Sequence, residues 1–217
     1  MDGDLAPLQG IVELARRHGA RVVVDEAHAT GVVGPGGRGL VADLGLEHEI
    51  DVVIGTLGKA LGSYGAFACG DARTADYLVN RARTLIYSTA LPPPALGASL
   101  AALQLLRDEP KIVNRLHVNA RALREELALN GFQVERGTMP IVPILVGDPG
   151  RAMALCEEAL RRGTFAQAIR PPTVPDGTSR LRAVAMASHE ERDLRAAART
   201  IASAARELGL DAVVPAA

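Results

Sequence analysis

The chain has few of the residues that mark several common classes of protein. Among its 217 residues there is no tryptophan, aromatic residues make up only 3%, and the two cysteines, Cys69 and Cys156, stand far apart. The cysteines lack the spacing of metal ligands, so we expect both to be reduced residues of the core and expect no metal site. With so few aromatic side chains, the core must consist mainly of alanine, valine and leucine.

Charge and hydropathy also give no sign of a polyanion or a bilayer as a partner. The formal net charge is −1 and no block of one sign occurs, so we expect neither nucleic acid nor a membrane as a partner. No apolar run approaches the ~18 residues that suggest a membrane span. The N-terminus, Met-Asp-Gly-Asp, has no targeting features. We therefore expect a globular, cytoplasmic protein.

Lysine is as scarce as cysteine. The chain has 24 basic residues, but only Lys59 and Lys111 are lysines. Lys59 lies in the segment Ile54-Gly-Thr-Leu-Gly-Lys-Ala-Leu-Gly62, where its neighbours are apolar or glycine. A lysine amine can lose its proton and form a Schiff base with a carbonyl group, which an arginine does not do. Lys59 is therefore a candidate reactive amine.

Helical and strand-like segments alternate along the chain, which predicts an α/β fold with a mainly parallel sheet. The predicted helices cover residues 7–18, 71–83, 92–107, 112–129, 151–162 and 190–208. The predicted strands cover residues 21–25, 51–56, 64–70, 141–146, 165–169 and 180–186, with a short extended piece at 85–89. The first two strands are continuous apolar runs, a pattern typical of strands buried on both faces. The glycine-dense segment 31–39 is expected to be a mobile loop.

The pattern of elements changes near Asp108. We expect residues 1–107 to belong to a large α/β domain and residues 108–217 to form a smaller α+β domain.

Two of the predicted strands end in polar clusters. The first runs Val22-Val-Val-Asp-Glu-Ala-His28, and the second ends at Thr56 with Lys59 three residues later. Ligands of open α/β sheets bind beyond the carboxyl ends of the strands. If the two strands are neighbours, the side chains of Asp25, His28, Thr56 and Lys59 converge. Taken singly, Asp25 could be a turn residue and His28 an ordinary loop histidine.

The glycines beside Lys59 do not form a nucleotide site. The segment lacks the four-residue spacer of a P-loop, and Ala60 replaces the hydroxyl residue that would reach Mg²⁺. Segment 34–39 does not follow a strand directly and open a helix, so it is no dinucleotide fingerprint. An aspartate for a pyridine nitrogen, a lysine amine and a hydroxyl for a phosphate are together the parts of a pyridoxal 5′-phosphate site.

Several motifs carry a resemblance to a known family. The segments Met-Asp-Gly-Asp-Leu-Ala-Pro-Leu, Val-Asp-Glu-Ala-His-Ala-Thr-Gly, Gly-Arg-Gly and Thr-Leu-Gly-Lys-Ala-Leu-Gly resemble those of the α-oxoamine synthases, which are pyridoxal phosphate enzymes of fold type I. Segments 85–93 and 168–182 are most similar to the branch that makes 8-amino-7-oxononanoate, for biotin, from L-alanine and a pimeloyl thioester. The resemblance implies a fold-type I transferase, here a partial large domain followed by the small C-terminal domain.

The resemblance also implies roles for individual residues. Lys59 would bind the cofactor covalently and later move the α-proton of alanine. Asp25 would pair with the pyridine nitrogen, His28 with the phenolic oxygen, and Thr56 with the phosphate.

Further residues are implied in substrate binding and at a subunit contact. Ser88 and Thr89 would reach the cofactor phosphate of a partner subunit, since the family's sites lie at a homodimer interface. Arg182 would bind the carboxylate of the amino acid, and Thr173 would contact substrate. The acyl donor would be a thioester of coenzyme A or of a carrier protein.

Relative to the family, the chain begins far inside the usual sequence. We therefore expect a fragment, a start assigned too late, or a product whose other half is encoded separately. Alone, it should bind pyridoxal phosphate weakly and have little activity. Two alternatives remain at this point: glycine C-acetyltransferase or another α-oxoamine synthase, and an inactive remnant that pairs with a complementary chain.

Overall fold

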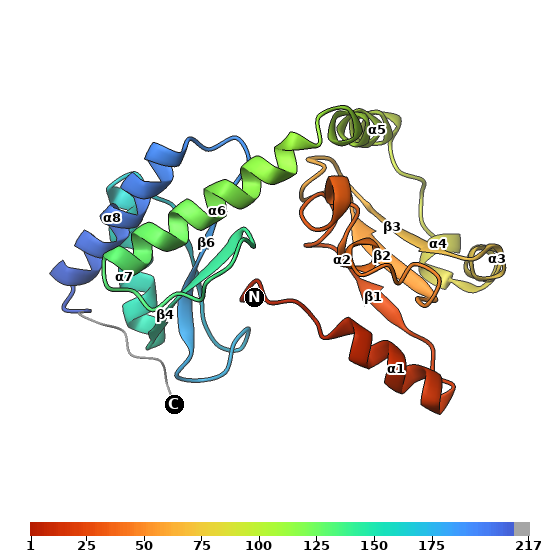
Figure 1. Ribbon diagram of the computed structural model, residues 1–217, viewed down its shortest axis with the longest axis horizontal. Helices are drawn as coiled ribbons and strands as arrows, with labels where there is room; N and C mark the ends of the chain where they lie inside the picture. Colours follow the sequence, from red (N-terminus) through yellow and green to blue (C-terminus); the bar gives the residue numbers. More distant parts are fainter. Residues whose placement is uncertain (211–217) are drawn as a thin grey trace. The chain divides into compact units, whose positions relative to one another are not determined.

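The computed structural model describes residues 1–210, and these form two compact units (Figure 1). Residues 6–113 form the N-terminal unit, whereas residues 1–5 join residues 114–210 in the C-terminal unit. The division that we expected after residue 107 therefore lies within the N-terminal unit. Helix α6 (Lys111–Leu129) begins in one unit and continues into the other.

The N-terminal unit contains a three-stranded sheet in the order β1-β2-β3 (Figure 1). Strand β1 (Val23–Asp25) pairs in parallel with β2 (Val52–Thr56), and β2 pairs antiparallel with β3 (Ala66–Gly70). The sheet is thus mixed rather than mainly parallel, because the short segment 57–65 returns the chain as an antiparallel neighbour instead of crossing over.

The three helices predicted between residues 7 and 107 are present as α1 (Leu8–His18), α3 (Ala72–Arg81) and α5 (Pro93–Asp108). The unit also contains three short elements that were not predicted: the 3₁₀ turn η1 (Pro35–Gly37), α2 (Leu40–Asp43) and α4 (Arg83–Ile86). The extended piece expected at 85–89 is wrong, because α4 occupies its start. The amide of Tyr87 donates to the carbonyl of Arg83 at 3.0 Å, which closes a helical turn. A short apolar run does not distinguish a strand from a helix by its pattern.

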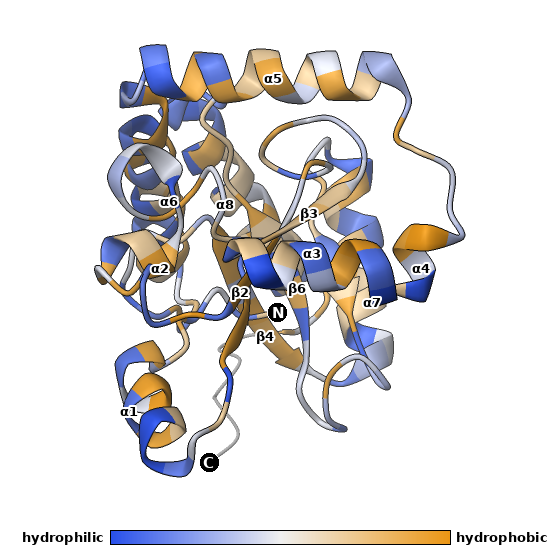
Figure 2. Cartoon of the chain, turned by 90° about the vertical axis from the view of Figure 1, so that its right-hand side faces the viewer, coloured by the Kyte–Doolittle hydropathy of each residue, from blue (hydrophilic) through white to orange (hydrophobic). Residues whose placement is uncertain are grey.

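The expectation that β1 and β2 are buried on both faces is also wrong. Val23 is 58% exposed and Ile54 is 36% exposed, although β2 is paired on both sides. Their side chains point out of the plane of the sheet, where paired strands do not cover them. Leu96 and Leu100 of α5 are also exposed. Hydrophobic residues recur along this helix (Figure 2). Cys69 on β3 is exposed as well, against our expectation of a core residue, whereas Cys156 is buried as expected.

The C-terminal unit has a closed hydrophobic core. Its antiparallel sheet has the order β4-β6-β5, formed by β4 (Ile141–Gly147), β5 (Gln167–Ile169) and β6 (Ser179–Val184). Helices α6, α7 (Pro149–Arg161) and α8 (Glu191–Glu207) complete the unit. Its fully buried side chains include Leu127, Ile144, Leu155, Leu181 and Ile201. Aliphatic residues therefore fill this core, as the shortage of aromatic residues predicts.

One buried arginine joins α6 to the segment that leads into β4. Arg124 is 8% exposed, and its Nε donates to the carbonyl of Glu135 at 3.1 Å. Its two terminal nitrogens donate to the carbonyls of Met139 and Ile141. The burial lowers the pKa of the guanidinium. Because backbone carbonyls removed from water need donors, Arg124 holds this irregular segment against the helix.

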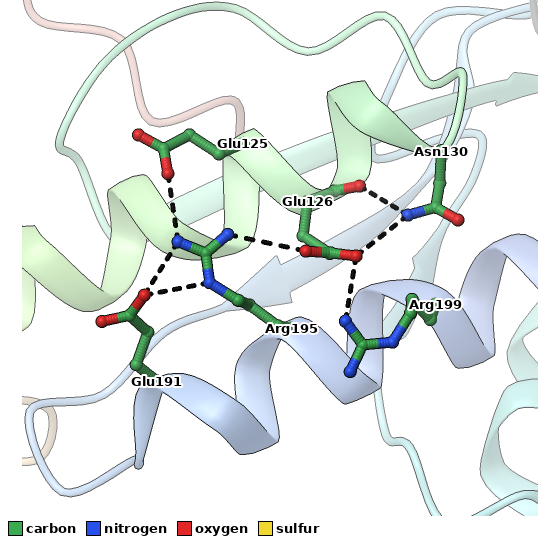
Figure 3. A network of polar contacts seen from close by, with 6 residues as sticks. All are labelled: Glu125, Glu126, Asn130, Glu191, Arg195 and Arg199. Carbon is green, nitrogen blue, oxygen red and sulfur yellow. Dashed lines mark hydrogen bonds and ion pairs between the residues drawn. The ribbon is translucent and has the colours of Figure 1, made fainter.

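A network of ion pairs links α6 to α8 (Figure 3). Its members are Glu125, Glu126, Asn130, Glu191, Arg195 and Arg199. The hydrogen bond from Arg199 is the main cause that lowers the pKa of Glu126. Arg195 meets acidic groups from both helices, so the network fixes how the two helices pack.

Within residues 1–210, no helix has both the length and the hydropathy that a membrane crossing requires.

Replacing Arg124 with alanine should destabilise the C-terminal unit by about 3 kcal/mol, because three carbonyls lose their donor and a buried stem is removed. Chemical denaturation followed by circular dichroism measures this change. The matched control is Arg136→Ala, since Arg136 is exposed and a change of under about 0.5 kcal/mol is expected there. Equal effects of the two substitutions would contradict the role of Arg124.

Stability of the C-terminal unit should fall as the pH drops below about 4.5, the ordinary pKa of a glutamate. The pKa of Glu126 is lower in the folded state, so its stabilising charge is complete above that pH and is lost as the pH falls through the folded pKa. Glu126→Gln should flatten this acid dependence in urea denaturation measured at several pH values. An unchanged profile in Glu126→Gln would refute the assignment.

Candidate functional site

Two strand ends bring the first candidate residues to one edge of the N-terminal sheet. In the parallel pair, Asp25 stands opposite Ile54, and the amide of Glu26 continues the ladder with a 2.7 Å bond to the carbonyl of Ile54. Thr56 ends β2 two residues further on. Because the carboxyl ends of parallel strands meet at the same edge, the turn that follows Asp25 and the turn that follows Thr56 lie at that edge.

The turn after β1 presents both of its polar side chains to solvent. The carboxylate of Asp25 accepts a 2.8 Å hydrogen bond from the amide of Ala27, the geometry of an aspartate turn. The amides of Ala29 and Thr30 donate to the carbonyl of Glu26, each at 2.9 Å, and His28 is exposed within this turn. Asp25 is therefore a turn residue, and its exposed carboxylate can also meet a ligand.

Lys59 lies in a loop that closes on itself. The hydroxyl of Thr56 donates to the carbonyl of Gly65 and accepts from the amide of Gly58, each at 3.2 Å. The amide of Gly62 donates to the carbonyl of Lys59 at 3.0 Å. These bonds fix the backbone of the loop, while the Lys59 side chain is exposed.

The glycine-dense loop packs against the Lys59 loop. Gly31 donates to the carbonyl of Gly37 at 2.7 Å, and both glycines are buried. A Cβ on Gly31 would lie 2.7 Å from the Cβ of Ala60, the residue after Lys59. Gly31 also has φ +78°, a conformation that favours glycine. The loop is compact and hydrogen-bonded, in contrast to the mobile loop that we expected, because its glycines allow this close approach.

A large cavity of the N-terminal unit lies on the other face of the sheet. It measures about 1660 Å³, more than the roughly 300–1,000 Å³ of a typical small-molecule site. Side chains that line it include Val53, Phe67, Cys69, Tyr77 and Leu103. Val53 is adjacent in sequence to Ile54, the partner of Asp25, and successive strand residues face opposite sides. The cavity is therefore an uncovered sheet face and not the site of Asp25.

Two further candidates lie in the C-terminal unit. Arg182 is in β6, the central strand, between Pro143 and Gln167 of its neighbours. Its Nε is buried and has no hydrogen-bond partner in the described part of the chain. Thr173 is exposed and follows the cis peptide Pro171–Pro172. A buried, unpaired guanidinium nitrogen is suited to an anionic ligand.

A second arginine on the same face of β6 is already paired. Arg180 forms an ion pair with Asp2, and its Nε donates to the carbonyl of Thr178 at 2.9 Å. The pair neutralises Arg180 two residues from Arg182, so the unpaired Nε of Arg182 distinguishes it. Sequence reasoning missed this contact, since nothing in the pattern connects Asp2 with a residue so far along the chain.

The remaining predicted residues are separate from these groups. Ser88 and Thr89 follow α4 in the N-terminal unit and are exposed; the hydroxyl of Ser88 donates to the carbonyl of Leu85 at 3.3 Å. The structure thus places Asp25, Thr56 and their two turns at one edge, but no described contact joins Ser88 or Thr89 to it. Within residues 1–210, no group of three or more histidine, cysteine or acidic side chains is arranged to hold a metal ion.

Comparison with known proteins gives consistent matches over most of the chain. The sequence profile of the family "aminotransferase class I and II" matches residues 1–201. The 8-amino-7-oxononanoate synthase of Anaeromyxobacter dehalogenans (strain 2CP-C) is 50% identical over 191 residues, which are 88% of this chain and 48% of that protein.

Two solved structures also align with most of this chain. A high-resolution structure of SPT with a PLP internal aldimine aligns with a TM-score of 0.90 at 33% identity, covering 95% of this chain and 52% of that one. The 8-amino-7-oxononanoate synthase of Francisella tularensis aligns with a TM-score of 0.81 at 27% identity, covering 96% and 61%. The predicted fold class is confirmed. The chain spans about half the length of the curated relatives it matches.

Gly31→Ala should disturb the Lys59 loop, because the added methyl group meets Ala60 and the backbone has positive φ. We expect a loss of roughly 2–5 kcal/mol, from about 1–2 for the left-handed backbone and about 1–3 for overpacking. Gly36→Ala is the matched control, since Gly36 has φ +61° but nothing within 4 Å of its added Cβ. Denaturation midpoints that shift equally in both variants would argue against the contact.

Proposed function

Because this chain belongs to the aminotransferase class I and II family, with relatives among the α-oxoamine synthases, we propose that it forms the lysine-bearing part of a pyridoxal phosphate-dependent acyltransferase. The reaction is the decarboxylative condensation of L-alanine with pimeloyl-CoA or a pimeloyl carrier protein to 8-amino-7-oxononanoate, in the cytoplasm. The observation that carries the proposal is the parallel pairing of β1 with β2, which puts Asp25 and the Lys59 loop at one sheet edge.

The residues at that edge suit pyridoxal phosphate in their chemistry. The cofactor supplies a ring that takes up the electron pair left when the amino acid loses its α-proton. The exposed Asp25 carboxylate would hold the proton on the ring nitrogen, and His28 would contact the phenolic oxygen. The amine of Lys59 would bind the cofactor and carry the α-proton. Thr56 would bind the phosphate, for which its hydroxyl must turn away from the carbonyl of Gly65, since phosphate accepts hydrogen bonds.

The C-terminal unit would supply the contacts to the amino acid. The buried Nε of Arg182 is a donor without a partner, and a carboxylate would satisfy it with a charge-assisted bond. Thr173, in the exposed loop that precedes β6, would contact substrate. Pairing of Arg180 with Asp2 would direct the carboxylate to Arg182.

Some apolar surfaces of the described chain are exposed to solvent. Exposed apolar residues and the large cavity of the N-terminal unit indicate surfaces that further polypeptide would cover in a complete enzyme. Ser88 and Thr89 would reach the cofactor of the second subunit in a homodimer. We therefore expect weak cofactor binding and little turnover from the 217 residues alone.

A second candidate is another α-oxoamine synthase. The SPT structure aligns with a higher TM-score than the 8-amino-7-oxononanoate synthase structure, so similarity of fold favours this candidate as well. Assays of alanine, glycine and serine against long and short acyl thioesters, in the complete enzyme, separate the two candidates.

Reduction with borohydride in the presence of pyridoxal phosphate should label Lys59 in preference to Lys111. Both lysines are exposed and lie in the N-terminal unit, so Lys111 reports non-specific reaction. Peptide mass spectrometry measures the two labels. Lys59→Arg should abolish the preferential label, whereas Lys111→Arg should leave it. Equal labelling of both lysines in the unaltered chain would support an inactive remnant instead.

A further inference from the structure

A second acidic residue lies between the candidate cofactor ligands and has no part in the proposed chemistry. Glu26 follows Asp25 directly, yet it is only 3% exposed. Successive residues at a strand end face opposite sides of the sheet, so the Glu26 side chain points away from that of Asp25. A carboxylate is rarely so deeply buried without a defined partner.

The partner is the backbone that follows the glycine-dense loop. The Oε1 atom of Glu26 accepts a 2.7 Å hydrogen bond from the amide of Val41, in a buried position. The other carboxylate oxygen lies against Gly39, where an added Cβ would come within 1.8 Å of it. Gly39 has φ +105°, so both the space and the backbone require glycine. The carboxylate therefore fixes the end of the loop.

The same loop contacts both candidate turns. At one end, Gly39 and Val41 meet Glu26, whose carbonyl holds the amides of Ala29 and Thr30 in the turn after Asp25. At the other end, Gly31 packs against Ala60 beside Lys59. Loop 31–39 is therefore a rigid spacer between the two turns, and Glu26 is its buried anchor.

We propose that Glu26 is a positioning residue that holds the Asp25–His28 turn and, through loop 31–39, the Lys59 loop in register for the cofactor. The inference rests on the proposed function, because the relative position of the two turns matters for cofactor binding only if that function is correct. Glu26 acts through a hydrogen-bond acceptor at Oε1 and does not touch the cofactor. This role explains why an acidic residue is buried beside an exposed one in the same motif.

Three substitutions test separately the hydrogen-bond acceptor, the side-chain length and the negative charge of Glu26. Glu26→Gln keeps an oxygen that can accept from Val41, Glu26→Asp keeps the charge but is one methylene too short, and Glu26→Ala removes the acceptor. Val12→Ala is the matched control, since Val12 is buried in α1 of the same unit and its truncation loosens the core while leaving the Glu26 acceptor in place.

Amide hydrogen exchange in the cofactor-free chain measures whether Glu26 holds the turn and the loop in place. Glu26→Ala and Glu26→Asp should speed exchange at Ala29, Thr30 and Gly31 by about tenfold or more relative to buried amides of α1, because the acceptor that anchors the loop is lost. Glu26→Gln should stay within about threefold of the parent chain. Val12→Ala should change α1 and the loop alike.

Binding of pyridoxal phosphate, followed by absorbance, is the second readout. The dissociation constant should rise about tenfold in Glu26→Asp, stay near the parent value in Glu26→Gln, and change less in Val12→Ala at equal stability. If Glu26→Ala does not fold, the comparison of Asp with Gln decides. Unchanged exchange in Glu26→Asp, or equal loss in Glu26→Gln and Glu26→Asp, would overturn the proposal. If the parent chain binds no cofactor, the proposed function fails for this form, while the exchange data still decide the role of Glu26.

Discussion

The parallel pairing of β1 with β2 is the contact on which the candidate cofactor edge depends. It sets Asp25 opposite Ile54 and is continued by the amide of Glu26, so one ladder determines where both turns begin. A slip by one residue would exchange the exposed Asp25 with the buried Glu26, since strand side chains alternate. The buried carboxylate and the close contact at Gly39 therefore act against such a slip.

The scarcity of lysine acquires a physical meaning in the structure. Arginines form these structural hydrogen bonds and ion pairs. Arg124 donates to three backbone carbonyls. Arg195 forms ion pairs with residues of two helices, and Arg180 pairs with Asp2. A rigid, permanently charged group suits these tasks, because several hydrogen bonds form for one ordered side chain. In the proposed function the amine of Lys59 would have to lose its proton, a task that an arginine does not perform.

The sequence predicted most elements and the grouping at the sheet edge, because long apolar runs and glycine stops are local signals. It did not predict the helical turn α4, where a short apolar run suits either structure, nor the exposure of Val23 and Cys69, which depends on what covers the sheet. The contact of Asp2 with Arg180 was also unpredictable, since it joins residues that only the tertiary fold brings together. The compact form of loop 31–39 required the shapes of its neighbours, although its glycines were visible.

The two units differ in how completely they bury their own apolar surface. The C-terminal unit, with Arg182, encloses a core of fully buried aliphatic side chains. The N-terminal unit, with Lys59, leaves Val23, Leu96 and Leu100 about half exposed, and burying such a side chain contributes about 1.5–3 kcal/mol. Its stability therefore gains more from any polypeptide or ligand that covers it. The Glu26 hydrogen bond and the glycine contacts lie within this unit, whose apolar side chains are less completely buried. They therefore hold the two turns in place where hydrophobic packing is less extensive.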